Sequence, residues 1–499
     1  MSAIQTALGL VFQPSVLLTI LLAAMFGLVV GAIPGLTATM AIALLVPVTF
    51  FMDPVPAVGT MVTCSAMAIF AGDIPGTLLR IPGTPASAAY TDEAYMMTRN
   101  GEGEIALGAN LLFSVIGGLF GTAVLILSAP ALAEVALKFS SFEYFWLALL
   151  GLTCAVFIGA ASPVKGFVSL FIGLFVSTIG LNNPAGVPRF TFGNAELTGG
   201  VNFIAAMIGL FAVSEIFRFA ISPKISGTPQ AVMGNLFRGW GRMMVQYWRQ
   251  QVRGNVLGTV IGALPGAGAD IAAWVSYALS KKMSRTPEKF GKGHVEGIIE
   301  STSSNNAALA GAWVPALVFG IPGDSITAVV IGVLYLKNMN PGPTIFLNSP
   351  QYIYAVFIIF ILANLVMLPL GWAAIRGARV ILRIPREILM PCILMFCIVG
   401  AFAINNSVFG VTVMLIFGIL GFLMEENDIP VAPCILGIVL GSMLEENFVT
   451  SMIKSDGSFL AFFERPIAGA LGVATLLVWL VPALILALRS RQTASSFGK

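Results

Sequence analysis

Charged side chains are scarce in this sequence. Only 10% of the 499 residues are Asp, Glu, Lys or Arg, against about 25% in soluble domains, while 57% are hydrophobic and the mean hydropathy is +0.93. With 26 basic and 23 acidic side chains, a soluble chain of this length could not cover its surface. The composition excludes a soluble globular enzyme, a nucleic-acid-binding protein and a disordered chain. It predicts an all-α polytopic protein of the lipid bilayer.

Histidine is nearly absent, and the cysteines show no pairing motif. The single histidine, His294, lies in a charged loop, and the five cysteines lie in apolar stretches without C-x-x-C spacing. Zinc sites and histidine-based acid–base catalysis therefore lack their usual residues. We expect buried free thiols and no cofactor other than a coupling cation.

Long charge-free runs show where the chain can cross a bilayer. A spanning helix needs about 20 apolar residues, so most of the runs hold one helix and the longest hold two elements. We expect about 10–12 spans plus two hairpins. The longest runs cover residues 1–52, 105–133, 144–164, 166–188, 338–375, 388–424 and 466–488.

The sequence contains an internal repeat. Residues 26–35, FGLVVGAIPG, match residues 257–266, LGTVIGALPG, at an offset of 231. Residues 214–217 and 445–448 share a Glu and a Phe at the same offset, and Ile-Pro-Gly at 81–83 recurs at 321–323. Three matches in the same order favour a duplication over chance.

Basic loops predict that the two copies have opposite topology. Residues 218–253 carry six Lys or Arg and no acid, and residues 281–300 are also basic, so both loops should be cytoplasmic. The 27 residues between them are too few for two crossings, and they predict a re-entrant hairpin. The same count places the first hairpin on the opposite face, an arrangement typical of secondary transporters.

These patterns divide the chain into four parts. For residues 1–21 two interpretations stay open, a separate span or an interfacial segment. The expected parts are a first inverted repeat (1–219, with a hairpin at 22–50 and a broken helix at 55–97), a cytoplasmic amphipathic linker (220–253), a second repeat (254–448, with a hairpin at 254–280 and a broken helix at 301–338) and a C-terminal helix (467–488).

Four Pro-Gly breaks interrupt the apolar segments. A break frees carbonyls that suit a hard cation such as Na⁺ and N–H groups that suit a carboxylate. Acids within apolar segments are costly and favour a functional interpretation, although N-capping of a half-helix is the alternative for them and for the hydroxyl residues. The predicted Na⁺ ligands, partly backbone carbonyls, are Gly35, Asp73, Gly83, Gly266, Asp270, Gly323 and Asp324. The predicted substrate contacts are Thr37, Thr39, Thr84, Ser87, Asn305, Asn306, Ser325 and Thr327.

From about residue 20 to 450, several motifs resemble the large membrane subunit of tripartite tricarboxylate transporters, the TctA family. They are Gly31-Ala-Ile-Pro-Gly-Leu36, Ile81-Pro-Gly-Thr-Pro-Ala86, Gly262-Ala-Leu-Pro-Gly-Ala-Gly-Ala-Asp270, Pro287-Glu-Lys-Phe-Gly291, Asn305-Asn306, Gly320-Ile-Pro-Gly323 and Pro341-Gly-Pro343.

The resemblance implies cation-coupled uptake, usually with Na⁺, of a small carboxylate across the bacterial inner membrane. It implies two partners, a periplasmic solute-binding protein that delivers the substrate and a small membrane subunit. Similarity to the related TRAP carriers implies an elevator motion.

The chain departs from the family pattern near the expected site. Asp73 stands where members often have Ser, Arg80 where they often have Asn, and Asp324 intervenes after Gly323, which Ser usually follows. A tricarboxylate substrate therefore does not follow, and Arg80 becomes a candidate second carboxylate contact through its bidentate guanidinium. Besides a carrier, a channel and an intramembrane enzyme are the alternative hypotheses.

Overall fold

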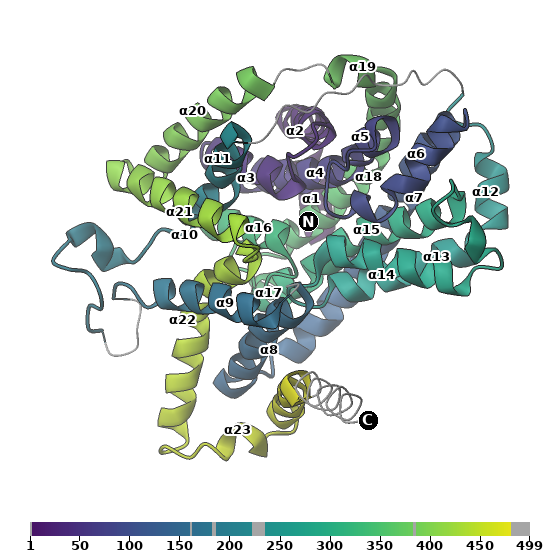
Figure 1. The fold of residues 1–499 in the computed structure, drawn as a ribbon. Coiled ribbons are helices and arrows are strands. Elements are labelled where there is room, and N and C mark those ends of the chain that lie inside the picture. Colours follow the sequence, from purple (N-terminus) through teal and green to yellow (C-terminus); the bar gives the residue numbers. More distant parts are fainter. Residues whose placement is uncertain (1, 160–161, 182–185, 222–234, 383–385, 481–499) are drawn as a thin grey trace, which may run out of the picture. The chain divides into compact units, whose positions relative to one another are not determined.

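The computed structural model describes residues 2–159, 162–181, 186–221, 235–382 and 386–480 (Figure 1). Throughout these ranges the regular elements are helices, and no strand is present. Seven of the described helices are long and apolar enough to cross a membrane, and six further apolar helices have 10–17 residues. The prediction of an all-α polytopic membrane protein is therefore confirmed, while the number of spans stays a prediction.

The chain forms two compact units, and each is built from segments that are far apart in the sequence. The first contains Met1–Leu137 and Asn202–Val431, and the second contains Lys138–Val201 and Ala432–Lys499. Each unit includes segments of both expected repeats, so the repeats do not correspond to separate compact units.

The first unit holds most of the helices. They are α1 (Ala3–Val11), α2 (Pro14–Ala32), α3 (Ala38–Phe50), α4 (Pro54–Ala71), α5 (Asp73–Leu79), η1 (Ser87–Ala89), α6 (Thr91–Arg99), α7 (Gly103–Ala136), α10 (Phe203–Met207), η3 (Ile208–Val213), α11 (Ser214–Ile221), α12 (Trp240–Gln246), α13 (Trp248–Gly262), α14 (Gly268–Met283), η4 (Pro287–Lys289), α15 (Val295–Phe319), α16 (Ser325–Leu336), α17 (Ile345–Asn348), α18 (Pro350–Arg376), α19 (Ala378–Ile381), α20 (Arg386–Asn405) and α21 (Val408–Glu426).

The second unit is smaller and has an aromatic core. Its helices are α8 (Ser141–Gly159), α9 (Pro163–Ser177), η2 (Ala195–Gly199), α22 (Val431–Lys454) and α23 (Ala461–Glu464), followed by an apolar helix over Pro466–Leu480. Trp146 packs against Phe462 and donates a hydrogen bond to its carbonyl at 2.9 Å. Of the expected C-terminal helix, residues 481–488 lie outside the described residues.

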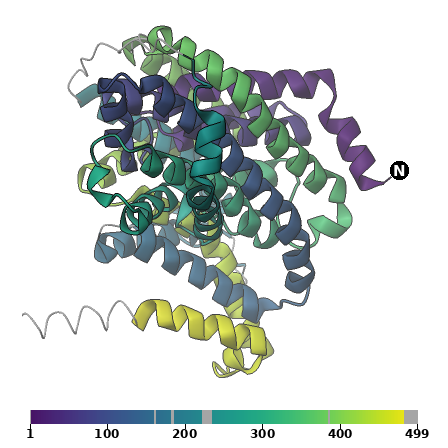
Figure 2. The same ribbon diagram turned by 90° about the vertical axis from the view of Figure 1, so that its right-hand side faces the viewer.

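The chain begins with a short helix followed by a longer one. Helix α1 has nine residues, which rise about 14 Å against the roughly 30 Å of a hydrocarbon core. Residues 14–21 continue into α2, so the first arm of the first hairpin begins at Pro14 rather than at residue 22. Residues 3–21 therefore contribute a nine-residue helix and the beginning of α2, and whether they span the membrane stays a prediction. In Figure 2, α18 lies beside α1 and α2, with which it is in contact.

The second hairpin also begins earlier than expected. Residues 222–234 of the expected linker lie outside the described residues, and a short helix, α12, precedes α13. Because α13 begins at Trp248, residues 248–253 of the expected amphipathic linker belong to the hairpin arm. Four arginines at helical spacing, Arg238, Arg242, Arg249 and Arg253, form a basic stripe that concealed this boundary. The Arg253 side chain pairs with Glu300 of α15 instead of facing solvent.

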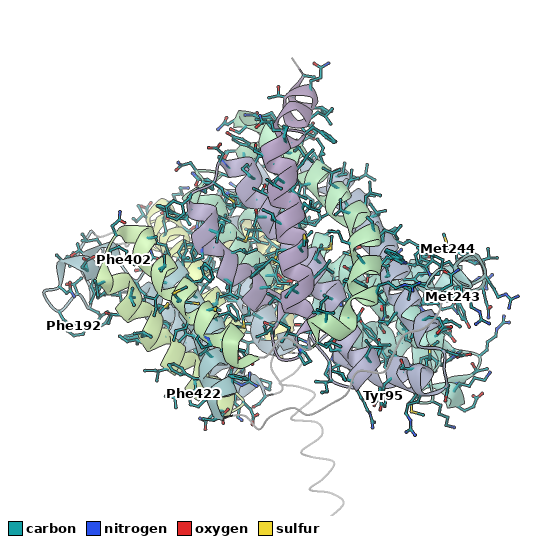
Figure 3. All side chains as sticks on the ribbon, turned by 90° about the horizontal axis from the view of Figure 1, so that it is seen from above. Tyr95, Phe192, Met243, Met244, Phe402 and Phe422 are labelled. Carbon is teal, nitrogen blue, oxygen red and sulfur yellow. The ribbon has the colours of Figure 1, made fainter. Side chains whose placement is uncertain are left out.

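Helices α4 and α5 form the centre of the first unit. Within the 26-residue segment Pro54–Leu79, 94% of the apolar window is buried, against 39–56% for the other candidate spans. The outside of the unit is apolar, as Figure 3 shows for Phe402 and Met244, which are 43% and 44% exposed. This pattern fits a protein whose lipid-facing helices surround an inner segment.

Glycines allow the hairpin arms to approach the broken helices closely. A Cβ added at Gly27 would meet the carbonyl of Cys64, and one at Gly31 would meet that of Ala68. In the second copy, Gly258 and Gly262 approach the carbonyls of Ser304 and Ala308. The glycines recur at an offset of 231 and their partners at 240, the offset of the Ile-Pro-Gly motifs. Small residues at four-residue spacing serve this close packing.

The cysteines carry no disulfide in the described structure. Four of the five free thiols are buried, as expected, and Cys392 is exposed. An apolar sequence around a cysteine does not imply burial in a membrane protein, because lipid-facing positions are equally apolar.

Candidate functional site

The two broken helices end in the same way. The C-cap residues that follow α5 and α15, Arg80 and Gly320, both lie in the left-handed region, with φ of +60° and +69°. In each break, the backbone N–H of the residue after the C-cap donates to a carbonyl of the helix six residues earlier, as in a Schellman motif. These bonds join Ile81 to Pro75 at 3.5 Å and Ile321 to Pro315 at 3.3 Å. Each position at the second break lies 240 residues after its counterpart at the first, as for Arg80 and Gly320, Ile81 and Ile321, and Pro75 and Pro315.

The chain restarts after each break in the same way too. The Asp324 carboxylate accepts the Thr327 N–H at 2.8 Å, and the Thr327 hydroxyl oxygen accepts the Asp324 N–H at 2.9 Å. At the matching positions, Thr84 and Ser87 exchange the same two bonds at 3.1 and 3.2 Å. The capping role proposed as the alternative is therefore realised at Asp324 and Thr327, where α16 begins. Thr84 and Ser87 form the same bonds in a turn before η1, whose N-cap residue is Ala86. Thr37 also caps α3, through the Met40 N–H at 3.2 Å.

The tip of the second hairpin contacts the restarts of both broken helices. Asp270 accepts a hydrogen bond from the Ala86 N–H at 3.0 Å, and the Trp274 indole donates to the Pro85 carbonyl at 3.2 Å. On the other side, the Gly266 N–H donates to the Gly323 carbonyl at 2.7 Å. We call residues 84–87, 266–270 and 323–327 the tip cluster. It unites residues from both halves of the sequence, separated by up to 243 positions.

The tip cluster carries two acids without a basic partner. Gly268, with φ of +64°, lies against the Asp324 side chain, and the two carboxylates are close enough to interact electrostatically. Asp270 is exposed and Asp324 is half-buried. No Lys, Arg or His among the described residues forms an ion pair with either acid. A cation could neutralise this charge.

Several predicted site residues lie elsewhere. Arg80 pairs with Asp92 at 2.8 Å, and both side chains are 62% exposed. Gly35, Thr37 and Thr39 belong to the first hairpin, which approaches the first break where the Gly31 carbonyl lies against Gly83. Ser325 begins α16 and is half-buried. No hydrogen bond or ion pair of the described residues joins Arg80, Thr37 or Thr39 to the tip cluster.

A second polar group lies in the interior of the first unit. The Tyr90 hydroxyl donates to the Asp73 carboxylate at 2.6 Å and lies near the side chains of Thr302 and Asn305. From Thr302 the bonds continue through Asn110 and Thr77 to the Asp73 carbonyl, at 3.1, 3.4 and 2.7 Å. We call these six residues the Asp73 network, and all of them are at most 2% exposed.

The predicted Asn305 and Asn306 are both buried, and their amide atoms have no hydrogen-bond partner in the described structure. Orphaned buried amides are rare, and each requires an explanation such as a bound ion. The sequence reasoning missed Tyr90, Asn110 and Thr302. The signal available was a single Asn within the charge-free run 105–133 and a Thr within the polar stretch 301–306.

Any metal here would be bound largely by neutral oxygens. The described residues contain no group of three His, Cys, Asp or Glu side chains that could hold a metal ion. Carbonyl, hydroxyl, amide and single carboxylate oxygens are present instead, and these donors fit a hard cation of low charge.

A buried glutamate joins α6 to the segment before α15. Glu93 is fully buried and accepts hydrogen bonds from the Gly293 and His294 N–H groups and from the Tyr277 hydroxyl, each at 2.8 Å. It also accepts one from the Gly291 N–H. We call this arrangement the Glu93 clamp. The acid is satisfied structurally, so we assign it no role in binding.

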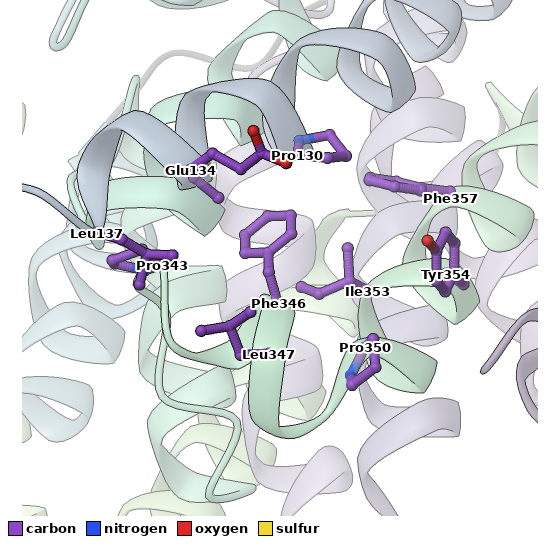
Figure 4. A pocket seen from close by; sticks show the side chains of 11 residues that line it. Pro130, Glu134, Leu137, Pro343, Phe346, Leu347, Pro350, Ile353, Tyr354 and Phe357 are labelled. Carbon is purple, nitrogen blue, oxygen red and sulfur yellow. The ribbon is translucent and has the colours of Figure 1, made fainter.

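A pocket of about 150 Å³ lies at the end of α7, beside α17 and α18. Figure 4 shows its lining, which is apolar apart from Glu134 and the Tyr354 hydroxyl. None of the predicted site residues lines it. It lacks the convergent polar groups that would fix a small anion.

Comparison with known proteins agrees with the motifs. The model of the tripartite tricarboxylate transporter TctA family matches residues 17–436. An Agrobacterium vitis protein described as an uncharacterized 52.8 kDa protein in the TAR-I ttuC' 3'region is 34% identical over 467 residues, 92% of each chain. An uncharacterized protein in the TAR-II ttuC' 3'region of the same species is 34% identical over 225 residues, which are 45% of this chain and 93% of that relative. No solved structure matches the chain.

Proposed function

Because the chain belongs to the tripartite tricarboxylate transporter TctA family, we propose that it is the large permease subunit of a cation-coupled uptake system for a small organic carboxylate. The coupling cation is Na⁺, a periplasmic solute-binding protein delivers the substrate, and a small membrane subunit completes the system in the bacterial inner membrane. The observation that carries the proposal is the tip cluster, where the second hairpin contacts both broken helices.

The tip cluster supplies the two kinds of group that such coupling requires. The restarting helix α16 and the tip before α14 present backbone N–H groups at the positive ends of helices, which attract a carboxylate. Asp270 and Asp324 would repel the same carboxylate if they stayed unneutralised. Bound Na⁺ removes that repulsion, so the anion binds well only after the cation. This order makes downhill Na⁺ entry drive substrate uptake.

The matched breaks support a transporter built from two copies of one unit. Caps, Schellman bonds and glycine contacts recur at two constant offsets, as expected for a duplicated hairpin and broken helix. The basic loops favour an inverted arrangement of the copies, and an elevator motion is the mechanism proposed for it.

We expect uptake to follow a Na⁺ gradient. The ligand of the genetically linked binding protein is first identified by a ligand screen, and the reconstituted system is then given that protein and its radiolabelled ligand. A tenfold inward Na⁺ gradient supplies about 1.4 kcal/mol per ion, enough for about tenfold accumulation per coupled ion. Equimolar K⁺ is the control. Accumulation that ignores Na⁺ would refute the coupling, and non-saturating flux would indicate a channel.

Two substitutions at Asp324 separate capping from ion binding. Asn caps a helix about as well as Asp, whereas Ala loses about 1 kcal/mol. We expect Asp324→Asn to keep the thermal stability and to lower the apparent Na⁺ affinity of uptake at least about tenfold, the effect typical of lost metal-site interactions. Asp324→Ala should lose both. If Asp324→Asn takes up substrate like the unmodified chain, the acid is a cap only.

A further inference from the structure

Asp73 is a buried carboxyl group without a counter-charge. It is 2% exposed and lies in the most buried candidate span of the described chain. One oxygen accepts the Tyr90 hydroxyl, and the other, Oδ2, has no hydrogen-bond partner. No Lys, Arg or His of the described residues forms an ion pair with it. An isolated buried carboxylate is strongly unfavourable and requires neutralisation.

The surroundings of this carboxyl are rich in neutral oxygens. Three helices, α5, α7 and α15, and the Tyr90 turn contribute to the Asp73 network. Apart from the Tyr90–Asp73 bond, its hydrogen bonds join neutral hydroxyl, amide or carbonyl groups. Aliphatic side chains would fill this interior at a lower free energy, since buried polar groups need complete hydrogen bonding to be tolerated. The network therefore has a use that packing does not explain.

Unpartnered groups of α15 lie on the side of the helix that faces Tyr90. Asn305 is near the Tyr90 hydroxyl, and Ser301 precedes it by one helical turn, which places the two on the same face. Both are fully buried, and neither the Asn305 amide nor the Ser301 hydroxyl has a hydrogen-bond partner. The side chains of Asp73 and Asn305, each with an unpartnered oxygen, thus both lie beside Tyr90.

We infer that Asp73, Tyr90 and Asn305 form a binding site for a monovalent cation of the Na⁺ class, separate from the tip cluster. One carboxylate balances one positive charge, and amide and hydroxyl oxygens are ligands that a hard cation accepts. A proton would neutralise Asp73 but would leave the oxygen of Asn305 unpartnered. A divalent ion would leave an excess positive charge in the interior.

The location links this site to the first break. Asp73 follows Gly72, whose carbonyl accepts the Gly83 N–H at 3.0 Å and so fixes the Ile-Pro-Gly segment. The inference rests on the proposed function for its meaning in transport, where the site adds one coupled ion to those of the tip cluster. Its existence as a binding site does not depend on transport and is measurable on the purified chain.

The test uses thermal unfolding of the detergent-purified chain in NaCl against choline chloride at constant ionic strength. The tip acids are first removed as Asp270→Asn/Asp324→Asn, which leaves Asp73 as the inferred site. We expect Na⁺ still to raise the unfolding midpoint of this variant, because a ligand that binds only the folded state stabilises it. Adding Asp73→Asn should abolish that rise. Adding Tyr90→Phe should raise the half-saturating Na⁺ concentration about tenfold or more.

Asp92→Asn is the matched control, since it removes an exposed carboxylate from the same region, and it should leave the response unchanged. A Na⁺ response that survives Asp73→Asn and Tyr90→Phe overturns the inference. The inference is also overturned if the unfolding midpoint responds to pH but not to Na⁺ and Asp73→Asn removes the pH response. If Asp73→Asn is not monodisperse on size exclusion, the Tyr90→Phe shift decides. If Na⁺ shifts the unfolding midpoint through Asp73 but does not drive uptake, the proposed coupling is refuted and the site is kept. If Na⁺ drives uptake but the midpoint does not depend on Asp73, the site is refuted and the coupling is kept.

Discussion

Replacing Gly258 by leucine is expected to prevent stable folding of the chain. Its added Cβ would meet the Ser304 carbonyl of α15, and two packed backbones cannot yield as a flexible side chain can. Overpacking a core costs about 1–3 kcal/mol even where side chains adjust, and domains are stable by only about 5–15 kcal/mol. Helix propensity favours leucine over glycine by nearly 1 kcal/mol, so any loss of stability in this variant must come from packing.

The measurement is the monodisperse fraction on size exclusion together with the unfolding midpoint. Gly241→Leu is the matched control, because Gly241 lies in helix α12 and has nothing within 4 Å of an added Cβ. The control should fold like the unmodified chain. A Gly258→Leu variant with an unchanged midpoint would show that α13 does not approach α15 closely.

Replacing Arg253 by methionine is expected to destabilise the fold by about 3–5 kcal/mol, the usual effect of removing one partner from a buried ion pair. The guanidinium donates two hydrogen bonds to Glu300, whose side chain is fully buried. Without the arginine, the carboxylate is left inside without a partner. The double variant Arg253→Met/Glu300→Met should recover most of the stability, because apolar side chains replace the pair.

The exposed pair of Arg80 and Asp92 provides the control for this experiment. Its side chains are 62% exposed, so Arg80→Met should change the unfolding free energy by only about 0–1 kcal/mol. Chemical denaturation in detergent measures all three variants. Equal effects at Arg253 and Arg80 would contradict a buried ion pair at α13 and α15.

The breaks and their caps could be predicted because they depend on local chemistry. An adjacent Pro-Gly pair favours a break in a helix, and Asp324 after the second break caps α16. The duplication was visible for the same reason, since repeated motifs preserve spacing. The start of α2 was missed although Pro14 stands at its first position, where proline is favoured, because the residues around it form one continuous apolar run.

The partners of the polar residues could not be read from the sequence. Tyr90 lies 17 positions from Asp73, and Asn110 bonds to Thr302 across 192 positions. No periodicity relates such residues, so Asp73 was grouped with the tips. Arg253 shows the same limit, because a stripe of arginines on one helical face looks solvated until its acidic partner is placed beside it.

The Glu93 clamp limits how the protein can move. Four donors from α14 and the segment before α15 converge on one buried carboxylate of α6. Hydrogen bonds to a charged group are worth about 1.5–3 kcal/mol each, so separating these segments would cost a free energy comparable with that of unfolding a domain. In the proposed elevator mechanism we therefore expect α6 and α14 to move together as one rigid body, with hinges outside residues 91–99 and 268–294.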